Sequence, residues 1–171
     1  MFDLESYDDA VAKMAKLAVG NAMPLHSWDF HASNFDNLKA SFSDAQKLQE
    51  LAEENRWIGH WNFLRELQND TTIVVTDAHL KIVFASENIL GMTGYLTEEV
   101  VGNSPKMFQG EATLKQDLKE IRTLIDSQKP FEKSIVNYKK NGEMYHCQIA
   151  AFPVFNAKKQ LVHFVAFEKA A

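Results

Sequence analysis

The chain has 171 residues, of which 46% are hydrophobic and 24% are charged, a composition typical of a soluble globular domain with an extension. The formal net charge of −5 argues against a nucleic-acid-binding protein, which would normally concentrate basic residues on one face. No apolar run approaches the ~20 residues that span a bilayer. The acidic start, MFDLESYDD, is unlike a secretory signal, so we expect a cytoplasmic protein without a membrane partner.

Cysteine and histidine usage excludes two further kinds of site. The single cysteine, Cys147, rules out an internal disulfide and a cysteine-rich zinc site. The six histidines show neither an HExxH motif nor paired spacing, so the sequence does not support a metal site.

Residues 1–70 are expected to form a helical extension. A helix is predicted over Ser6–Val19, where Ser6 and Asp9 have capping-box spacing, and a packed irregular linker is predicted over Asn21–Phe30. A weakly patterned helix should follow from His31 to Phe42.

A better helix is expected to begin at Ser43, because Ser43 and Gln46 again match a capping box, and to end near Asn55. After it, apolar side chains recur at helical spacing. Trp57, Trp61, Leu64 and Leu67 predict one apolar face on a last helix that reaches about Gln68. This face must be buried somewhere.

Residues 71–168 have the pattern of an α+β domain with an antiparallel sheet. Short links join two strands, a group of helices and three further strands. The expected strands are Thr72–Thr76, Lys81–Ser86, Phe131–Tyr138, Glu143–Phe152 and Leu161–Glu168. The expected helices are Glu87–Gly94, one that Thr97 caps and Gly102 ends, and one that Thr113 opens with a buried stripe of Leu114, Leu118, Ile121 and Ile125.

Over nearly all of Thr71–Glu168 the chain resembles the PAS sensory fold. The resemblance is carried, in order, by VVTDAHLKIVFAS, NILGMTGY, EEVVG, GNSPKMFQG and NYKKNGEMYHCQIAAFPVFN. It implies a five-stranded antiparallel sheet that cups a small pocket under short helices.

Within that family the chain is similar to the light-oxygen-voltage branch, whose loop reads G-x-N-C-R-F-L-Q-G and whose cysteine attacks a photoexcited flavin. The matching loop positions here hold Ser104, Pro105 and Lys106, and Gln109 is kept. Asn137 also matches a flavin-contacting asparagine of the branch. Cys147 and Glu168 stand where an asparagine and a glutamine hold the flavin ring.

These replacements argue against light-driven flavin chemistry. Proline has no nucleophile, so no cysteinyl adduct can form at Pro105. Glu168 puts a carboxyl group where a neutral amide both donates and accepts a hydrogen bond. Gln109 and Asn137 keep FMN binding open as the alternative. Heme binding is not expected, because the axial histidine that the resemblance implies is missing from Leu114–Ser127.

The candidate cofactor-binding residues also have simpler interpretations. Asn137 and Gln109 either contact a ligand or bond to neighbouring backbone, and both interpretations remain open. For Cys147 we favour a small buried hydrophobe over a redox thiol, for Lys106 a surface lysine over an anion partner, and for Glu168 a solvated position near the chain end. A small ligand, if one binds, should lie between Asn137, Cys147 and Ile149 on the sheet and the Gly102–Gly110 loop.

The opposite sheet face is expected to carry Ala150, Phe152, Val165 and Phe167, which are too apolar to face water. Either the apolar face led by Trp57 and Trp61 or a second subunit should cover it, and the resemblance implies dimerisation through this surface. No catalytic motif is present, and we expect no output domain after the last strand. We therefore expect a stand-alone, non-enzymatic signal-transduction module that acts by protein–protein contact. The alternative is a flavin-binding photoreceptor or redox sensor.

Overall fold

A computed structural model describes residues 26–69 and 71–171, with side chains from residue 37 onward. The expected helix over residues 6–19 and the first half of the expected linker lie outside the described residues. The chain divides into two compact units, Met1–Asn37 and Leu38–Ala171. All contacts considered below lie within the second unit.

A single helix, α2 (His26–Glu54), replaces the linker end and the two helices predicted from the sequence. The predicted linker through Phe30 and the predicted helix start at Ser43 are both wrong. The range contains neither glycine nor proline, so nothing ends the helix there. Exposed side chains four residues apart support its C-terminal half: Gln46 Nε2 donates to Glu50 Oε1 at 3.0 Å.

The helix predicted to carry both tryptophans is wrong in its first half. Arg56 and Gly59 adopt positive φ angles of 53° and 119°, which interrupt the helical path. Trp57 instead forms an isolated antiparallel bridge with Asn156. Only α3 (Phe63–Gln68) is helical, and the Asn62 side chain caps it by accepting from the Arg65 amide at 3.2 Å.

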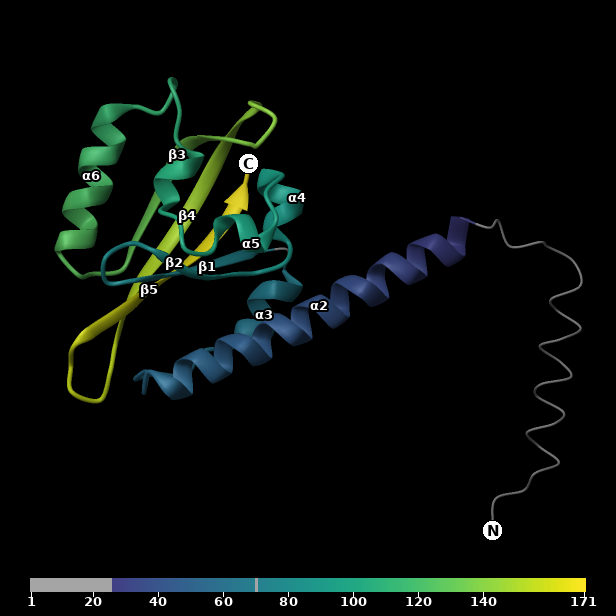
Figure 1. Cartoon of the computed structure of the whole chain (residues 1–171), viewed down its shortest axis with the longest axis horizontal. Coiled ribbons are helices and arrows are strands. Elements are labelled where there is room, and N and C mark those ends of the chain that lie inside the picture. Colours follow the sequence, from purple (N-terminus) through teal and green to yellow (C-terminus); the bar gives the residue numbers. More distant parts are fainter. Residues whose placement is uncertain (1–25, 70) are drawn as a thin grey trace, which may run out of the picture. The chain divides into compact units, whose positions relative to one another are not determined.

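The sheet has five antiparallel strands in the order β2-β1-β5-β4-β3, which confirms the predicted architecture (Figure 1). Its strands are β1 (Thr72–Asp77), β2 (Ile82–Ala85), β3 (Phe131–Tyr138), β4 (Met144–Phe155) and β5 (Leu161–Ala170). The predicted turn at Asn141–Gly142 joins β3 to β4, with Gly142 at a φ of 87°.

Four short elements connect β2 to β3: α4 (Ile89–Thr93), α5 (Thr97–Val100), the 3₁₀ turn η1 (Pro105–Phe108) and α6 (Lys115–Asp126). Two details differ from prediction. The N-cap residue of α5 is Leu96 and not the predicted Thr97. The Leu96 amide donates to the Glu99 carboxylate at 2.9 Å. The predicted buried stripe of α6 is wrong: Leu114 lies just before the helix and is 62% exposed, and Leu118, Ile121 and Ile125 are only partly buried.

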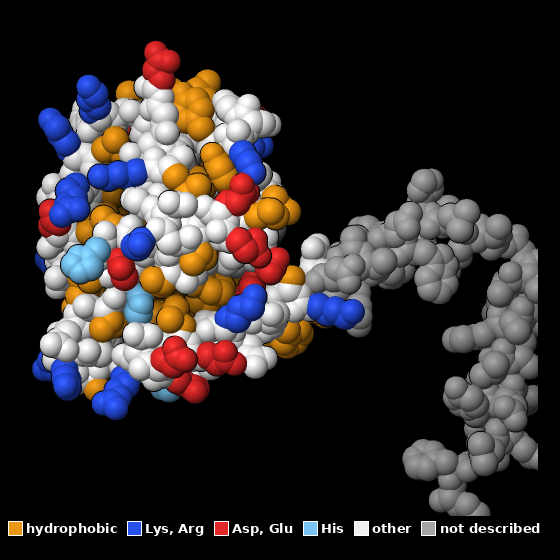
Figure 2. All heavy atoms as spheres, in the orientation of Figure 1, with side chains coloured by type: hydrophobic (Ala, Val, Ile, Leu, Met, Phe, Trp, Pro, Cys, Tyr) orange, Lys and Arg blue, Asp and Glu red, His pale blue; other side chains and the backbone are white. Residues whose placement is uncertain are grey.

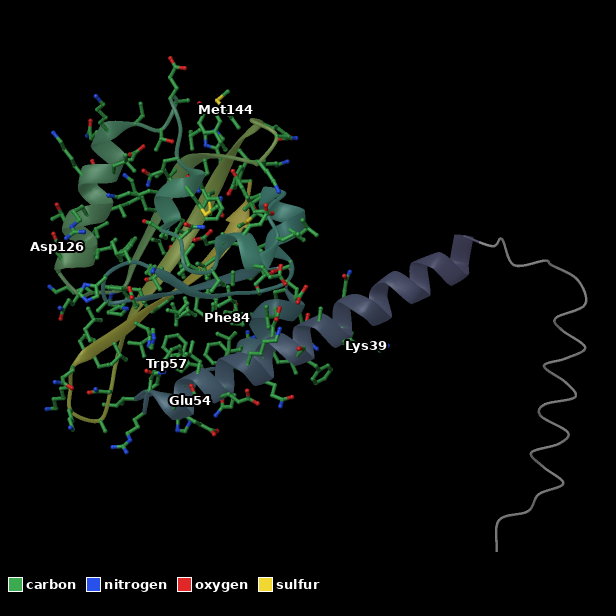
Figure 3. The ribbon with its side chains drawn as sticks, in the orientation of Figure 1. Lys39, Glu54, Trp57, Phe84, Asp126 and Met144 are labelled. Carbon is green, nitrogen blue, oxygen red and sulfur yellow. The ribbon has the colours of Figure 1, made fainter. Side chains whose placement is uncertain are left out.

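Apolar clusters lie on both faces of the sheet. On the inner face, α4, α5 and η1 enclose one cluster and α4 and α6 enclose another. On the outer face, Leu48 of α2 and Phe63 and Leu67 of α3 pack on the strands. The buried strand residues of this outer cluster are Ile73, Val75, Phe84, Val154 and Val165. Figure 3 shows Trp57 and Phe84 in the layer between α2 and the sheet.

The chain itself covers the outer face, as one of the two sequence-based alternatives predicted. The Trp61 ring lies edge-on to Phe152, with ring centroids 6.1 Å apart, and stacks on Phe167 at 6.3 Å. Trp57 packs against the same cluster and donates its indole N–H to His163 Nδ1 at 3.0 Å. The contacts are therefore as expected, although the tryptophans lie on an irregular segment instead of a helix.

Candidate functional site

The loop Gly102–Gly110 is fixed to the sheet at its start. The Gly102 amide donates to the Ile82 carbonyl, and the Ile82 amide donates to the Asn103 carbonyl, each at 2.8 Å. Pro105 begins η1, where its fixed φ suits the first position of a helical turn. Pro105 is the residue that the resemblance matches to the reactive cysteine of light-oxygen-voltage loops, and here it begins a helical turn.

The end of the loop is held against β3. The Thr113 hydroxyl accepts from the Gly110 amide at 3.0 Å and donates to the Val136 carbonyl at 2.7 Å. The Tyr138 ring lies so close to Gly110 that an added Cβ would be 2.4 Å from Tyr138 Cε2. The Tyr138 hydroxyl in turn accepts from the Ala112 amide at 2.8 Å. These contacts set the loop beside the strand that carries Asn137.

Two loop residues named from the sequence differ in exposure. Gln109 is partly buried at the end of η1, whereas Lys106 is exposed, in line with the surface lysine that the sequence favoured. The structure thus gives Lys106 no enclosed position from which to hold an anion.

Strand register brings three of the predicted site residues together on the inner face. Asn137 of β3 pairs with Tyr145 of β4. Two residues away on each strand, Ile135 pairs with Cys147. Glu168 of β5 pairs with Ile149 of β4. The Cys147 thiol donates to the Glu168 carboxyl group, with 3.6 Å between Sγ and Oε2. We call Asn137, Tyr145, Cys147 and Glu168 the inner-face polar cluster.

The expectation of a solvated Glu168 near the chain end is wrong. Glu168 is 7% exposed, because β5 continues two residues beyond the predicted end and β1 and β4 flank this position. Burial raises the pKa of its carboxyl group from 4.5 to about 7, and the hydrogen bond from Cys147 offsets part of that rise. Glu168 therefore titrates near neutral pH inside the sheet.

The other groups of the inner-face polar cluster are neutral at that pH. Burial, and then the neighbouring Glu168, raise the pKa of the Cys147 thiol, which disfavours the reactive thiolate. Burial also raises the pKa of the Tyr145 hydroxyl. The neighbouring Asn137 side chain offsets part of this rise, but the two groups do not form a well-aligned hydrogen bond. Tyr145 was not among the site residues predicted from the sequence.

Apolar side chains from the helices pack on this cluster. Met92 of α4 and Leu118 and Ile121 of α6 contact the group formed by Ile135, Tyr145 and Cys147. The inner face is consequently a mixed environment in which an ionisable pair lies among methyl and methylene groups.

Other kinds of site find no support in the described part of the chain. Residues 26–69 and 71–171 contain no cluster of three or more side chains suited to a metal ion. None of the described helices is long and apolar enough to cross a membrane. On the face in Figure 2, basic side chains are spread among acidic and apolar ones and do not form one continuous patch.

Comparison with known proteins identifies the family. Residues 69–169 match the sequence profile of the PAS domain. The chain is 37% identical over 97 residues to a blue-light-activated histidine kinase of Brucella canis, covering 55% of this chain and 20% of the kinase. It is 35% identical over 128 residues to Protein TWIN LOV 1 of Arabidopsis thaliana, covering 70% of this chain and 32% of that protein. This chain thus spans about a fifth of the kinase and a third of the plant protein.

Solved structures show the same fold. The light state of the Aureochrome1 LOV domain is 25% identical, with a TM-score of 0.57 over 63% of this chain and 87% of that one. The PAS domain of the fruit-fly ELK potassium channel is 21% identical, with a TM-score of 0.55 over 60% of this chain and 87% of the other. The chain belongs to the PAS domain family of sensory modules in signal transduction, and its relatives include proteins of the light-oxygen-voltage type.

Proposed function

We propose that this chain is a PAS signalling module that acts through protein–protein contacts and does not form a cysteinyl–flavin adduct. The observation that carries the proposal is the buried Cys147–Glu168 pair on the inner face, together with Pro105 in the loop. Pro105 offers no nucleophile. The Cys147 thiol is fully buried, its pKa is raised, and it is hydrogen-bonded to a carboxyl group.

The residues on the inner face do not fit a flavin well. The polar edge of a flavin ring needs partners that both donate and accept, as amide side chains do. Here the Cys147 thiol already donates a hydrogen bond to the Glu168 carboxyl group, so part of the hydrogen-bonding capacity of both side chains is used. Met92, Leu118 and Ile121 already pack on Tyr145 and Cys147, where a ligand would have to displace them. Heme has no axial histidine on α6.

The second candidate function is a flavin-binding photoreceptor or redox sensor. Asn137 and Gln109 favour it, because the buried Asn137 amide and the partly buried Gln109 amide are kept at positions that match the light-oxygen-voltage branch. The names of the kinase and TWIN LOV relatives point the same way.

An absorption spectrum of the purified chain separates the two functions. We expect no flavin band at stoichiometric strength after purification, with an equimolar FMN solution as the reference. If FMN is added and retained, blue light should produce no flavin–thiol adduct, because neither Pro105 nor the buried Cys147 supplies a reactive thiolate. A stoichiometric band would favour the alternative, and a flavin–thiol adduct detected by mass would contradict the proposal.

The partner is proposed to be a protein in the cytoplasm, either a second copy of the chain or another signalling protein. Exposed apolar side chains on α2 support a contact surface, since Leu38 and Phe42 lie one helical turn apart and Phe42 is 54% exposed. Light scattering over a range of concentrations distinguishes the two partners. A concentration-dependent dimer would indicate self-association, and a monomer throughout would leave a different protein as the partner.

A further inference from the structure

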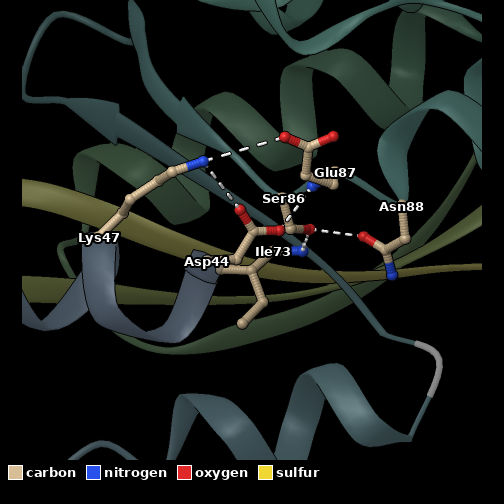
Figure 4. Close-up of polar contacts among 6 residues, drawn as sticks. All are labelled: Asp44, Lys47, Ile73, Ser86, Glu87 and Asn88. Atoms are coloured by element: carbon tan, nitrogen blue, oxygen red, sulfur yellow. Dashed lines mark hydrogen bonds and ion pairs between the residues drawn. The ribbon is translucent and has the colours of Figure 1, made fainter. Parts of the chain in front are cut away.

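A buried acidic side chain joins helix α2 to the turn before α4. Asp44 is 2% exposed, and its Oδ2 accepts a hydrogen bond from the Glu87 amide at 2.7 Å (Figure 4). Lys47 lies 3.5 Å from Asp44 Oδ1 and 3.9 Å from Glu87 Oε1, and its own side chain is about half exposed. Burial raises the pKa of the Asp44 carboxyl group, while the Glu87 amide and Lys47 offset part of that rise.

Side-chain hydrogen bonds also hold this turn, residues 86–88, to the start of β1. Ser86 Oγ accepts from the Ile73 amide at 2.8 Å and donates to Asn88 Oδ1 at 2.6 Å. Asn88 Nδ2 donates to the Thr71 carbonyl at 3.1 Å. Residues 86–88 are therefore fixed between the start of β1 and the side chain of one α2 residue.

Helix α4 begins directly after this turn and reaches the inner-face polar cluster. Ile89, the first residue of α4, is fully buried, and Met92 of the same helix packs on the group that contains Tyr145 and Cys147. The Thr93 hydroxyl donates to the Ile89 carbonyl at 2.8 Å, which links the last residue of this five-residue helix to the first. Because α4 is so short, we expect a displacement at Met92 to shift the Glu87 amide as well.

We propose that the Asp44–Glu87 hydrogen bond couples the inner face of the sheet to helix α2, so that a change around Met92 alters how firmly α2 is held. The contacts run from Cys147 and Tyr145 through Met92 to α4, then through the Glu87 amide to Asp44. Asp44 is a positioning residue in this route, since it contacts no part of the inner face itself. The inference rests on the proposed signalling role only in treating α2 as an output surface.

Hydrogen exchange measured on a mutant cycle tests the coupling directly. Met92→Ala removes side-chain atoms from the inner face, and Asp44→Ala removes the acceptor for the Glu87 amide. In the parent background we expect Met92→Ala to raise amide exchange in residues 38–54 at least about fivefold, the lower end of typical coupling between sites. In the Asp44→Ala background the same change should raise exchange there less than about twofold, because the connection is already lost.

Two surface variants are the controls. Met144→Ala removes an exposed methionine at the start of β4, and Gln49→Ala removes an exposed α2 side chain that bonds only within its helix. Neither substitution should change the effect of Met92→Ala on amide exchange in residues 38–54, with or without Asp44. If Asp44→Ala does not fold, Asp44→Leu keeps roughly the size of the side chain and removes the acceptor for the Glu87 amide, and it should reduce the Met92→Ala effect by more than half.

The coupling is refuted if Met92→Ala leaves α2 exchange unchanged in the parent, or raises it equally with and without Asp44. Either result would contradict the proposed coupling through Asp44 without bearing on the proposed function. The proposed function would fail on a different measurement, the flavin spectrum, so the two failures are distinguishable.

Discussion

The buried carboxyl group of Glu168 predicts an unusual dependence of stability on pH. Its folded-state pKa of about 7 lies above the ordinary value of 4.5, so the folded chain binds a proton more tightly than the unfolded chain. The resulting contribution to stability is fully present below pH 4.5 and is lost as the pH rises through 7. The pKa difference corresponds to roughly 3 kcal/mol. Urea unfolding at pH 5 and pH 8 should show this loss in the parent and not in Glu168→Gln.

The comparison must be made between the two proteins, because His163 acts in the opposite direction. Burial lowers the pKa of His163, so its contribution to stability is present above pH 6.5 and is lost on acidification. This contribution is common to the parent and to Glu168→Gln and cancels in their difference. Equal pH profiles for the two proteins would show that Glu168 is not buried as described.

A second prediction at the residue scale concerns the glycine at the end of the loop. Gly110→Ala should lower the free energy of unfolding by about 1–3 kcal/mol, because the new methyl group would overlap the Tyr138 ring. Gly91→Ala is the matched control: it lies within α4, where an added Cβ meets nothing within 4 Å, and it should be neutral or stabilising by up to about 1 kcal/mol. Thermal melts compare the two, and equal effects would contradict the close packing at Gly110.

At the scale of elements, strands were more predictable than helix boundaries. Alternation and β-branched residues located all five strands within a few residues of their observed ends, since each has at least one face on an apolar cluster. The break predicted at Ser43 failed because a capping-box pattern can also occur inside a helix. The side chain of the neighbouring Asp44 accepts a hydrogen bond from the amide of Glu87, 43 residues away. Local residue spacing contains no information about that contact.

The candidate site was predictable in position and less so in chemistry. The sequence placed Asn137 and Cys147 on one face of the sheet, and the structure agrees because the register of β3 and β4 has no irregularity there. The burial of Glu168 depends on β5 extending between β1 and β4, and a position near a chain end does not reveal that pairing. The Cys147–Glu168 hydrogen bond follows from the pairing and was not foreseen.

The irregular segment before α3 can be tested through Trp61. Its ring packs on Phe63, Phe152 and Phe167 but is only partly buried, so Trp61→Ala should destabilise the chain by about 2–4 kcal/mol, less than the ~3–5 kcal/mol of a fully buried aromatic ring. Ile58→Ala, at a side chain that is 55% exposed, should cost less than about 1 kcal/mol. Urea unfolding measures both. A Trp61→Ala protein as stable as the parent would mean that this segment is not part of the folded unit.

At the scale of the whole molecule, the outer cluster decides where an independently stable domain can begin. Leu48, Phe63 and Leu67 supply the cover for a sheet face whose buried residues include Val75 and Val165, so residues 71–168 alone would expose that face to water. Each large apolar side chain removed from water contributes about 1.5–3 kcal/mol. A chain starting at Leu38 should therefore unfold cooperatively, whereas one starting at Thr71 should aggregate or melt at a much lower temperature. Calorimetry and light scattering on both truncated proteins check this expectation, and a soluble, equally stable protein from Thr71 onward would show that α2 and α3 are dispensable for the PAS fold.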